Sequence, residues 1–187
     1  DAQNLCNLLY KKTKLEDTFG VNMLAVADGR PETLGIVPII RHHVNFQYEL
    51  ATRKYTTLLA KELDKKEIQE GLIRACDLID LIIEILRGSK NVKDAKACLT
   101  SGETAAIRFK SKESEQKAKL LHFTERQASA ILEMRLYKLI GLEIDALMAE
   151  HNETLANIEK YQDILTNRAS MAKVIIKELD AMKKQYG

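Results

Sequence analysis

The feature that most constrains the fold is the distribution of proline along the chain. Both prolines, Pro31 and Pro38, lie near the start of the 187 residues, and none occurs after Pro38. Proline interrupts a helix because it lacks a backbone N–H and clashes with the preceding turn, so its absence permits very long helices. Pro38 itself suits the first turn of a helix, where its N–H would be unpaired in any case. The sequence therefore predicts a mainly α protein from Pro38 onward.

Two segments far apart in the chain carry apolar residues at the heptad spacing of a coiled coil. Gln47 and Lys54 interrupt the first of these seams, whose apolar members are Val37, Val44, Ala51 and Leu58. The second seam lies between Glu143 and Tyr186, where no Gly or Pro occurs. Its members are Ile144, His151, Ile158, Leu165, Ala172, Leu179 and Tyr186, with Leu147, Tyr161, Ile175 and Met182 three positions later. One helix over this segment would be roughly 65 Å long and would need a partner.

We expect the two seams to pair antiparallel within one chain, because the first seam otherwise has nothing to cover it. A parallel coil between the last helices of two molecules is the alternative. The intramolecular pairing predicts a long antiparallel coiled coil that carries a small helical globular tip. It divides the chain into residues 1–36, a first coiled-coil helix at 37–67, a helical globular module at 68–141 and a returning helix at 142–187.

The predicted module contains recognisable helix signals. Residues 68–86 are apolar nearly all round, which is typical of a helix in a globular core. Asn91 suits the N-cap of a short helix that ends near Leu99. Residues 100–119 are polar and lysine-rich and read as a surface loop or weak helix.

Thr124 and Gln127 have the spacing of a capping box, which predicts a helix from Thr124 to Ile140 with Gly141 as its stop. On a helical wheel, one face points to the local core and consists of Ala128, Ile131, Leu132, Leu136 and Leu139. The opposite face carries Ala130, Met134 and Tyr137, where a surface helix is normally polar. A second apolar face fits a protein–protein contact. Burial of both faces within the same chain is the alternative.

The first 36 residues predict a short β-hairpin, with strands at 19–26 and 32–36 around an Asp28-Gly29 turn. A lone hairpin is marginally stable in water, so we expect this one to complete a sheet with other residues. The chain also begins at Asp1 without an initiator Met. Together these features lead us to expect a piece of a longer protein.

Charge, cysteine and hydropathy exclude several classes of function. The formal net charge is only +2, so a DNA-facing role would need local clusters of basic residues. The three cysteines, Cys6, Cys76 and Cys98, lack metal-ligand spacing and indicate a reduced, cytosolic compartment. No apolar run is long enough to span a membrane, and no signal peptide is apparent. No constellation suggests a catalytic or metal site, so we expect neither here.

Four segments, in order, resemble the A subunits of bacterial type IIA topoisomerases. The segment from Thr124 to Glu143 matches every fixed position of the family form T-x-x-Q-A-x-A-I-L-x-M-R-L-x-x-L-x-G-L-E. The others are Leu9–Leu15 with Phe19, Asn22 and Met23, similar to L-Y-K-x-T-x-L-x-x-x-F-x-x-N-M; Glu49–Lys54, similar to E-V-V-T-R-R; and Ile68–Leu72 with Ile79 and Asp80, similar to I-L-E-G-L and I-D. The Gly-Leu-Glu ending is more similar to gyrase than to topoisomerase IV. The equivalent segment of topoisomerase IV and an unrelated coiled-coil scaffold are the alternatives.

The resemblance implies the end of the tower domain, the coiled coil and the exit-gate (C-gate) dimerisation module of such a protein. The family passes one DNA duplex through a transient break in another. It uses ATP and a divalent metal such as Mg²⁺ on other domains, and a catalytic tyrosine upstream of the matched segments. The resemblance implies a homodimer, with double-stranded DNA and a gyrase B subunit for partners, and a bacterial cytoplasmic, nucleoid-associated location. Ala130, Met134 and Tyr137 would lie in the dimer interface.

The resemblance also implies candidate DNA contacts, because the tower flanks the bound duplex. These are phosphate contacts from Lys11, Lys12 and Lys14, with Arg53 and Lys54 as further candidates, although a charged helix face is more often simply solvated. The chain departs from the family form in two places. Phe46-Gln47 stand where His-Arg is usual, and Lys54 replaces the second arginine, which puts a bidentate contact from that position in doubt.

Overall fold

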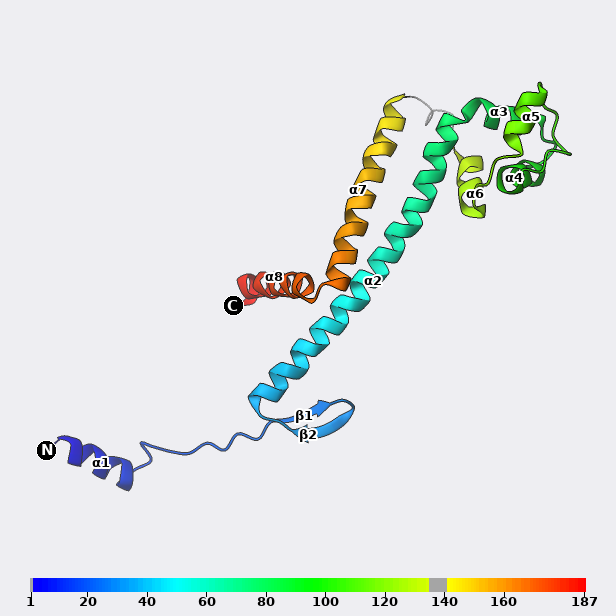
Figure 1. Cartoon of the computed structure of the whole chain (residues 1–187). Coiled ribbons are helices and arrows are strands. Elements are labelled where there is room, and N and C mark those ends of the chain that lie inside the picture. Colours follow the sequence, from blue (N-terminus) through cyan, green and yellow to red (C-terminus); the bar gives the residue numbers. More distant parts are fainter. Residues whose placement is uncertain (1, 135–140) are drawn as a thin grey trace. The chain divides into compact units, whose positions relative to one another are not determined.

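A computed structural model of the chain describes residues 2–134 and 141–187. Within those residues it contains eight helices and a two-stranded antiparallel sheet, which confirms the mainly α prediction (Figure 1). The chain divides into two units, Asp1–Glu49 and Leu50–Gly187, and the boundary falls within a long helix. The elements are α1 (Ala2–Lys12), β1 (Leu24–Ala27), β2 (Arg30–Thr33), α2 (Ile36–Asp77), α3 (Ile79–Gly88), α4 (Val92–Ser101), α5 (Lys112–Ala118), α6 (Glu125–Glu133), α7 (Gly141–Thr166) and α8 (Arg168–Tyr186).

The hairpin of the first unit forms around the predicted turn. Asp28 and Gly29 both have positive φ, at 51° and 78°, as the type I′ turn of a two-residue hairpin requires. Ala27 pairs with Arg30 across the turn. The strands are shorter than predicted, four residues each, and of the described residues in this unit Ala27 alone is buried. The hairpin therefore gains little stability from a core of its own.

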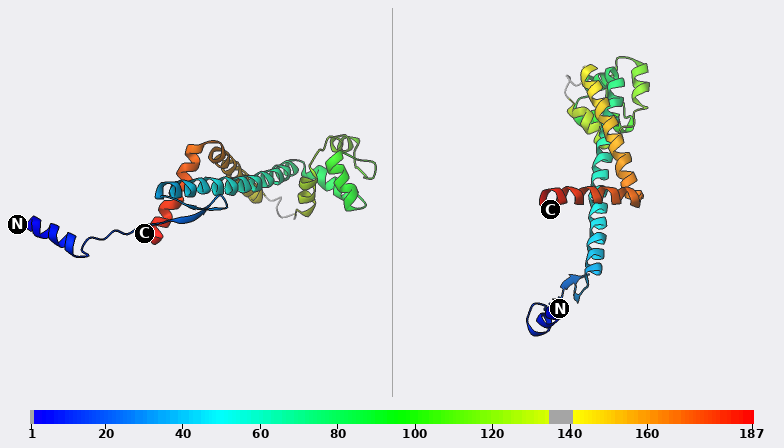
Figure 2. Two further views of the ribbon diagram at one scale, coloured as in Figure 1. Left: turned by 90° about the horizontal axis from the view of Figure 1, so that it is seen from below. Right: turned by 90° about the vertical axis from the view of Figure 1, so that its left-hand side faces the viewer.

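In the second unit, α7 lies beside α2 and runs in the opposite direction (Figure 2). The rings of Tyr55 and Tyr161 meet with centroids 5.5 Å apart, and further along the pair Leu72 and Leu147 line one cavity. As residue numbers rise along α2 they fall along α7, so the pairing is antiparallel and lies within one chain. The predicted antiparallel coiled coil is confirmed for this part of the chain.

The details of the first seam differ from the prediction. Ala51 is buried, but Val37 and Val44 remain 60% and 43% exposed. The second buried position of the repeat is Tyr55, four residues after Ala51, and the predicted position at Lys54 lies at the edge of the contact. The buried positions of a heptad are separated alternately by three and by four residues. A pattern with weak d positions therefore does not show whether the residue three or four positions after Ala51 is buried.

The sequence predicted a single helix for the returning segment, but the structure contains two. Helix α7 ends at Thr166 and α8 begins at Arg168, with Asn167 in an extended conformation between them. The Asn167 side chain accepts a hydrogen bond from the Ala169 N–H, 3.0 Å away, and so acts as the N-cap of α8. After this break the buried residues are Met171 and Ile175, whereas Leu179 and Met182 are 41% and 61% exposed.

Helices α3 to α6 form a helical module whose core also includes the end of α2. Asn91 caps α4 as predicted, accepting from the Asp94 N–H at 2.8 Å. The 100–119 segment contains α5. Two residues of the segment, Ile107 and Ala118, are buried in the core, which its polar composition did not predict. Fully or nearly fully buried side chains of this core include Ala75, Ile82, Ile85, Ala95, Cys98, Leu99, Ala118, Leu121 and Ala128.

Candidate functional site

Helix α6, which carries the candidate interface residues, is anchored to α2 by its first turn. The predicted capping box is present: Thr124 accepts from the Gln127 N–H, and the Gln127 side chain accepts from the Thr124 N–H at 3.0 Å. The Thr124 hydroxyl also donates to a Glu67 carboxylate oxygen 2.7 Å away, and the Gln127 amide donates to the Glu67 carbonyl at 2.8 Å. The same residues that begin α6 therefore hold it to α2.

Arg126 adds an ionic link to this anchor. Its Nη1 lies 2.7 Å from an Asp64 oxygen and 3.0 Å from a Glu67 oxygen. The hydrogen bond and charge of Asp64, followed by those of Glu67, raise the pKa of Arg126 above its usual value. All three side chains are in contact with solvent, so each ion pair contributes little by itself. The network mainly fixes the orientation of α6 against α2.

Gly71 permits the close approach of these two helices. A Cβ on Gly71 would lie 2.5 Å from Cγ and 2.7 Å from Cβ of Gln127, closer than atoms can pack. The sequence pattern did not assign a role to Gly71. Its signal is a glycine inside a helix, where the residue is normally unfavourable and indicates a packing reason.

The structure places the candidate interface residues differently from the helical wheel. Helix α6 ends at Glu133, and Met134 is extended with φ −67° and ψ 129°, so the prediction of one helix to Ile140 was wrong. Gly141 is the first residue of α7 and not a stop. Tyr137 lies outside the described residues. The core face is as predicted for Ala128 and Ile131, which are buried.

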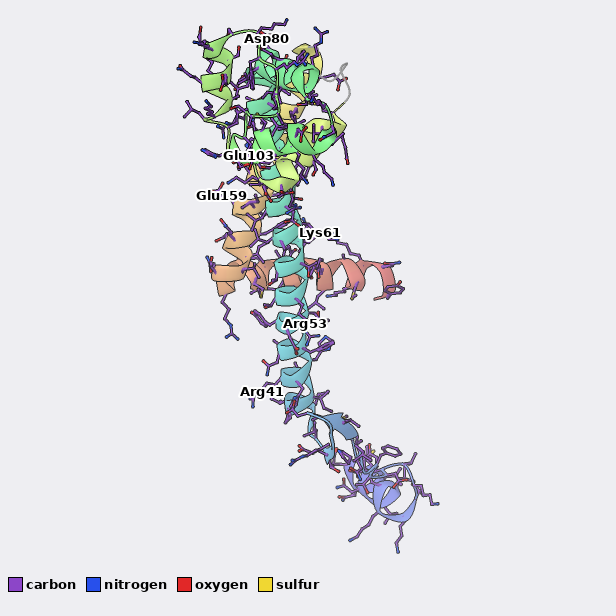
Figure 3. All side chains as sticks on the ribbon, turned by 90° about the vertical axis from the view of Figure 1, so that its right-hand side faces the viewer. Arg41, Arg53, Lys61, Asp80, Glu103 and Glu159 are labelled. Atoms are coloured by element: carbon purple, nitrogen blue, oxygen red, sulfur yellow. The ribbon has the colours of Figure 1, made fainter. Side chains whose placement is uncertain are left out.

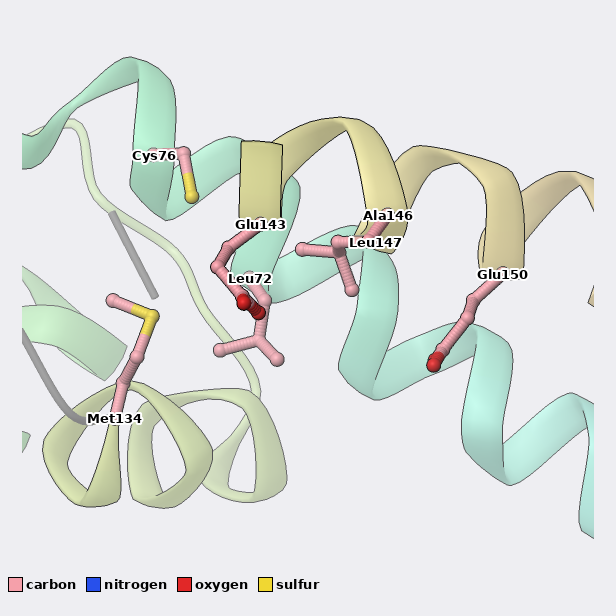
Figure 4. A pocket seen from close by; sticks show the side chains of 7 residues that line it. All are labelled: Leu72, Cys76, Met134, Glu143, Ala146, Leu147 and Glu150. Atoms are coloured by element: carbon pink, nitrogen blue, oxygen red, sulfur yellow. The ribbon is translucent and has the colours of Figure 1, made fainter. Parts of the chain in front are cut away.

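Ala130 and Met134 line separate hollows. Ala130 is half-buried beside a shallow depression that also involves Ile68, Lys96, Glu125, Arg126, Ser129 and Glu133. Met134 points towards a small cavity of about 100 Å³ between α2 and α7 (Figure 4). The other lining residues of that cavity are Leu72, Cys76, Glu143, Ala146, Leu147 and Glu150. Ala130 therefore lies beside a surface depression, whereas Met134 lines a cavity together with residues of α2 and α7.

The candidate DNA-contact residues fall in different units. Lys11 and Lys12 form the last turn of α1, Lys14 follows it, and all three are exposed in the first unit. In the second unit, Arg53 is exposed on α2 (Figure 3). Lys54 is less available, because its ammonium lies 2.7 Å from a Glu178 oxygen of α8.

The Lys54 contact has an electrostatic consequence. The hydrogen bond to Glu178 raises the pKa of Lys54 above its usual value, and the ammonium also lies 5.5 Å from the centre of the Tyr55 ring. Both side chains of the ion pair are 52% exposed, so the link is screened and weak. Its position nevertheless ties α8 to α2.

The described part of the chain offers neither a metal centre nor a membrane span. In the ranges 2–134 and 141–187, no three His, Cys, Asp or Glu side chains gather in a way that would hold a metal ion. None of the helices in these ranges combines the length and apolar character that crossing a bilayer needs.

Comparison with known proteins shows the family to which the chain belongs. The family model that describes the A subunits of DNA gyrase and topoisomerase IV matches residues 1–180. The chain belongs to this family. The DNA gyrase A subunit of Clostridium acetobutylicum is 36% identical over 183 residues, which cover 98% of this chain and 20% of that protein. The DNA topoisomerase 4 A subunit of Staphylococcus aureus is 34% identical over 186 residues, which cover 100% of this chain and 21% of that protein.

This member of the gyrase and topoisomerase IV family spans about one fifth of the length of those relatives. Two of the segments that resemble the family form lie on elements of the anchor between α6 and α2. Gly71 belongs to the segment at Ile68–Leu72, and Thr124 and Gln127 begin the segment that ends at Glu143. In this family member, two of the four resembling segments thus meet where α6 contacts α2.

Proposed function

We propose that this chain is the exit-gate (C-gate) dimerisation module and supporting coiled coil of the A subunit of a bacterial DNA gyrase. The single observation that carries the proposal is a compact helical module fastened to α2 by the Asp64, Glu67 and Arg126 network, beside an antiparallel α2–α7 pair. Two such modules that meet would close an exit for a transported duplex. The paired helices would hold them at a distance from the site of DNA cleavage.

The segment itself is non-catalytic in this proposal. The complete protein would be an ATP-dependent type II DNA topoisomerase, with ATP and Mg²⁺ bound by other domains and with the gyrase B subunit for a partner. It would act on double-stranded DNA in the bacterial cytoplasm, at the nucleoid. Family membership supports this reading over an unrelated coiled-coil scaffold.

The dimer interface would include Ala130, Met134 and Tyr137. A gate that stays shut during cleavage yet opens once per cycle needs an interface of middling strength, with roughly 1,000–2,000 Å² buried. Of the two described residues, Ala130 is the better placed, because it lines a shallow depression whereas Met134 lines a small cavity between α2 and α7. A charged side chain there would be desolvated on association and would oppose it.

Sedimentation velocity of the chain tests the interface. The Ala130→Arg, Met134→Glu double variant should sediment as a monomer at concentrations where the unmodified chain is a dimer. The matched control is Ala156→Arg with Met148→Glu, since both residues are exposed on α7. A double variant that remains fully dimeric contradicts the assignment of these residues, and an unmodified chain that never dimerises contradicts the proposed module.

Contact with DNA phosphates is proposed for Lys11, Lys12 and Lys14, whose exposure supports it. In the complete protein, reversing these three charges should weaken DNA binding and reduce its salt dependence, because fewer counterions are released. Lys90→Glu, Lys93→Glu and Lys110→Glu are the control, as these lysines are exposed on the helical module. Equal affinity of both triple variants and the parent would end the proposal.

Gyrase is preferred over topoisomerase IV because of the Gly141-Leu142-Glu143 ending, although relatives of both kinds are similar to the chain. The complete protein with its B subunit distinguishes them. Negative supercoiling of relaxed circular DNA is the expected activity. Decatenation without supercoiling would assign the chain to topoisomerase IV.

A further inference from the structure

Four polar residues occupy the contact between α2 and α7 where a coiled coil is normally apolar. They are Glu62 and Gln69 on α2 and His151 and Thr154 on α7, called here the polar layer. Gln69 is 3% exposed and Thr154 is fully buried. The layer lies between the Tyr55–Tyr161 ring contact at one end and the cavity lined by Leu72 and Leu147 at the other.

Helix geometry shows that Gln69 faces α7. Residues seven apart on an α-helix differ by only about 20° in direction, so Glu62 and Gln69 point the same way as Tyr55. Asp64, Glu67 and Gly71 point to the other side of α2, where they contact α6. Gln69 is therefore covered by α7 and not by the helical module.

The polar layer is not satisfied by hydrogen bonds across the contact. Both amide atoms of Gln69, Oε2 of Glu62 and Nδ1 of His151 are buried, and none of them has a hydrogen-bond partner within residues 2–134 and 141–187. The Thr154 hydroxyl donates to the Glu150 carbonyl of its own helix at 2.9 Å. Each unpartnered atom would regain a hydrogen bond to water if the helices separated, which favours local opening.

The two sides of α2 differ in how firmly they are held. On the α6 side, a single residue of α2, Glu67, accepts three hydrogen bonds. The donors are Thr124, Arg126 and Gln127. On the α7 side, no hydrogen bond or ion pair among the described residues links Glu62 or Gln69 to α7. Hydrogen bonds therefore hold this stretch of α2 to the α6 side and not to α7.

We propose that the polar layer is a site of local opening, at which α7 separates reversibly from α2. The Tyr55–Tyr161 contact at one end and the side chains of Leu72 and Leu147 at the other keep the helices in register. The inference goes beyond the proposed gate function and depends only on packing within the second unit. Such a point would let the supporting helices flex without unfolding the module at their end.

Hydrogen–deuterium exchange of the full chain, followed in peptides over 147–158, tests the proposal. Gln69→Leu removes the unpartnered amide and keeps the volume similar, so amide exchange in these peptides should slow about tenfold. The melting temperature should rise as well. Gln69→Met, which has an unbranched side chain, should act in the same direction and covers the case in which leucine packs badly.

Gln162→Leu is the matched control, because Gln162 is exposed on α7 and the chemical change is identical. It should leave exchange over 147–158 unchanged. Faster exchange or a lower melting temperature in both Gln69 variants would overturn the proposal, since it would mean that the Gln69 amide is satisfied, for example by ordered water. Exchange equal to that of the Gln162 variant would overturn it too.

Discussion

Tyr161 of α7 lies against Tyr55 of α2, with ring centroids 5.5 Å apart and ring planes inclined by 49°. Tyr55 is 8% exposed, so the contact closes the end of the α2–α7 pair nearest α8. Tilted aromatic pairs add stabilisation beyond their buried area. The contact places Tyr161 of α7 at the level of Tyr55 on α2.

Removal of the Tyr55 ring should destabilise the second unit. We expect Tyr55→Ala to lower the free energy of unfolding by about 3 kcal/mol, because it leaves a cavity under Tyr161. Urea denaturation followed by circular dichroism measures the change. Tyr186→Ala is the control, since Tyr186 is 80% exposed and its loss should change stability by no more than about 0.5 kcal/mol. Equal losses in the two variants would contradict the importance of the ring contact.

A methyl group on Gly71 should separate α6 from α2. Although alanine is the better helix former by about 1 kcal/mol, the close approach of Gln127 should make Gly71→Ala destabilising by about 1–3 kcal/mol. Thermal unfolding provides the measurement. Gly20→Ala should be nearly neutral, because no atom lies within 4 Å of a Cβ built there. A stabilised Gly71 variant would show that the anchor is looser than its geometry indicates.

The three cysteines should react with a thiol reagent at different rates. Burial raises the pKa of the Cys98 thiol to about 11, and burial followed by the charge of Asp77 raises the pKa of Cys76. Because the thiolate is the reacting form, Cys98 should be labelled only on unfolding and Cys76 slowly at pH 8, whereas exposed Cys6 should react first. Mass spectrometry of peptides after timed labelling gives the order. Early labelling of Cys98 would contradict its burial.

Glu84 should contribute a pH-dependent share of stability. The Lys110 backbone N–H donates to its carboxylate, and this bond is the main cause that lowers the pKa of Glu84 below its usual value. A lowered folded-state pKa stabilises the native state above the unfolded pKa near 4.5, and the contribution is lost as pH falls through the folded value. The difference in melting temperature between the parent and Glu84→Gln should therefore shrink between pH 6 and pH 3.

The control for this measurement is Glu159→Gln, since Glu159 is exposed on α7 (Figure 3). Its melting temperature should follow that of the parent across the same range. A Glu84 variant that behaves in the same way would show that the Lys110 contact does not favour the charged carboxylate.

Features that arise from residues close together in the chain could be predicted before the fold was known. The Asp28-Gly29 turn, the Asn91 cap and the Thr124 capping box each arise from a side chain or backbone conformation that acts within three or four positions. The heptad stripes also predicted that two distant helices pair, because apolar residues at that spacing must be covered.

The pairs of residues that meet across those helices could not be predicted in the same way, because they depend on the packed fold. The burial of Tyr55 in place of Lys54 depends on Tyr161, and the contact between Gly71 and Gln127 joins residues more than fifty positions apart. The break at Asn167 depends on competition between a local helix cap and a long heptad seam. Gln69 is the clearest case, since composition assigns a glutamine to the surface and the packing of α7 buries it. The physical reason is that periodicity specifies a face of a helix, whereas register and depth depend on the shape of the surface that covers it.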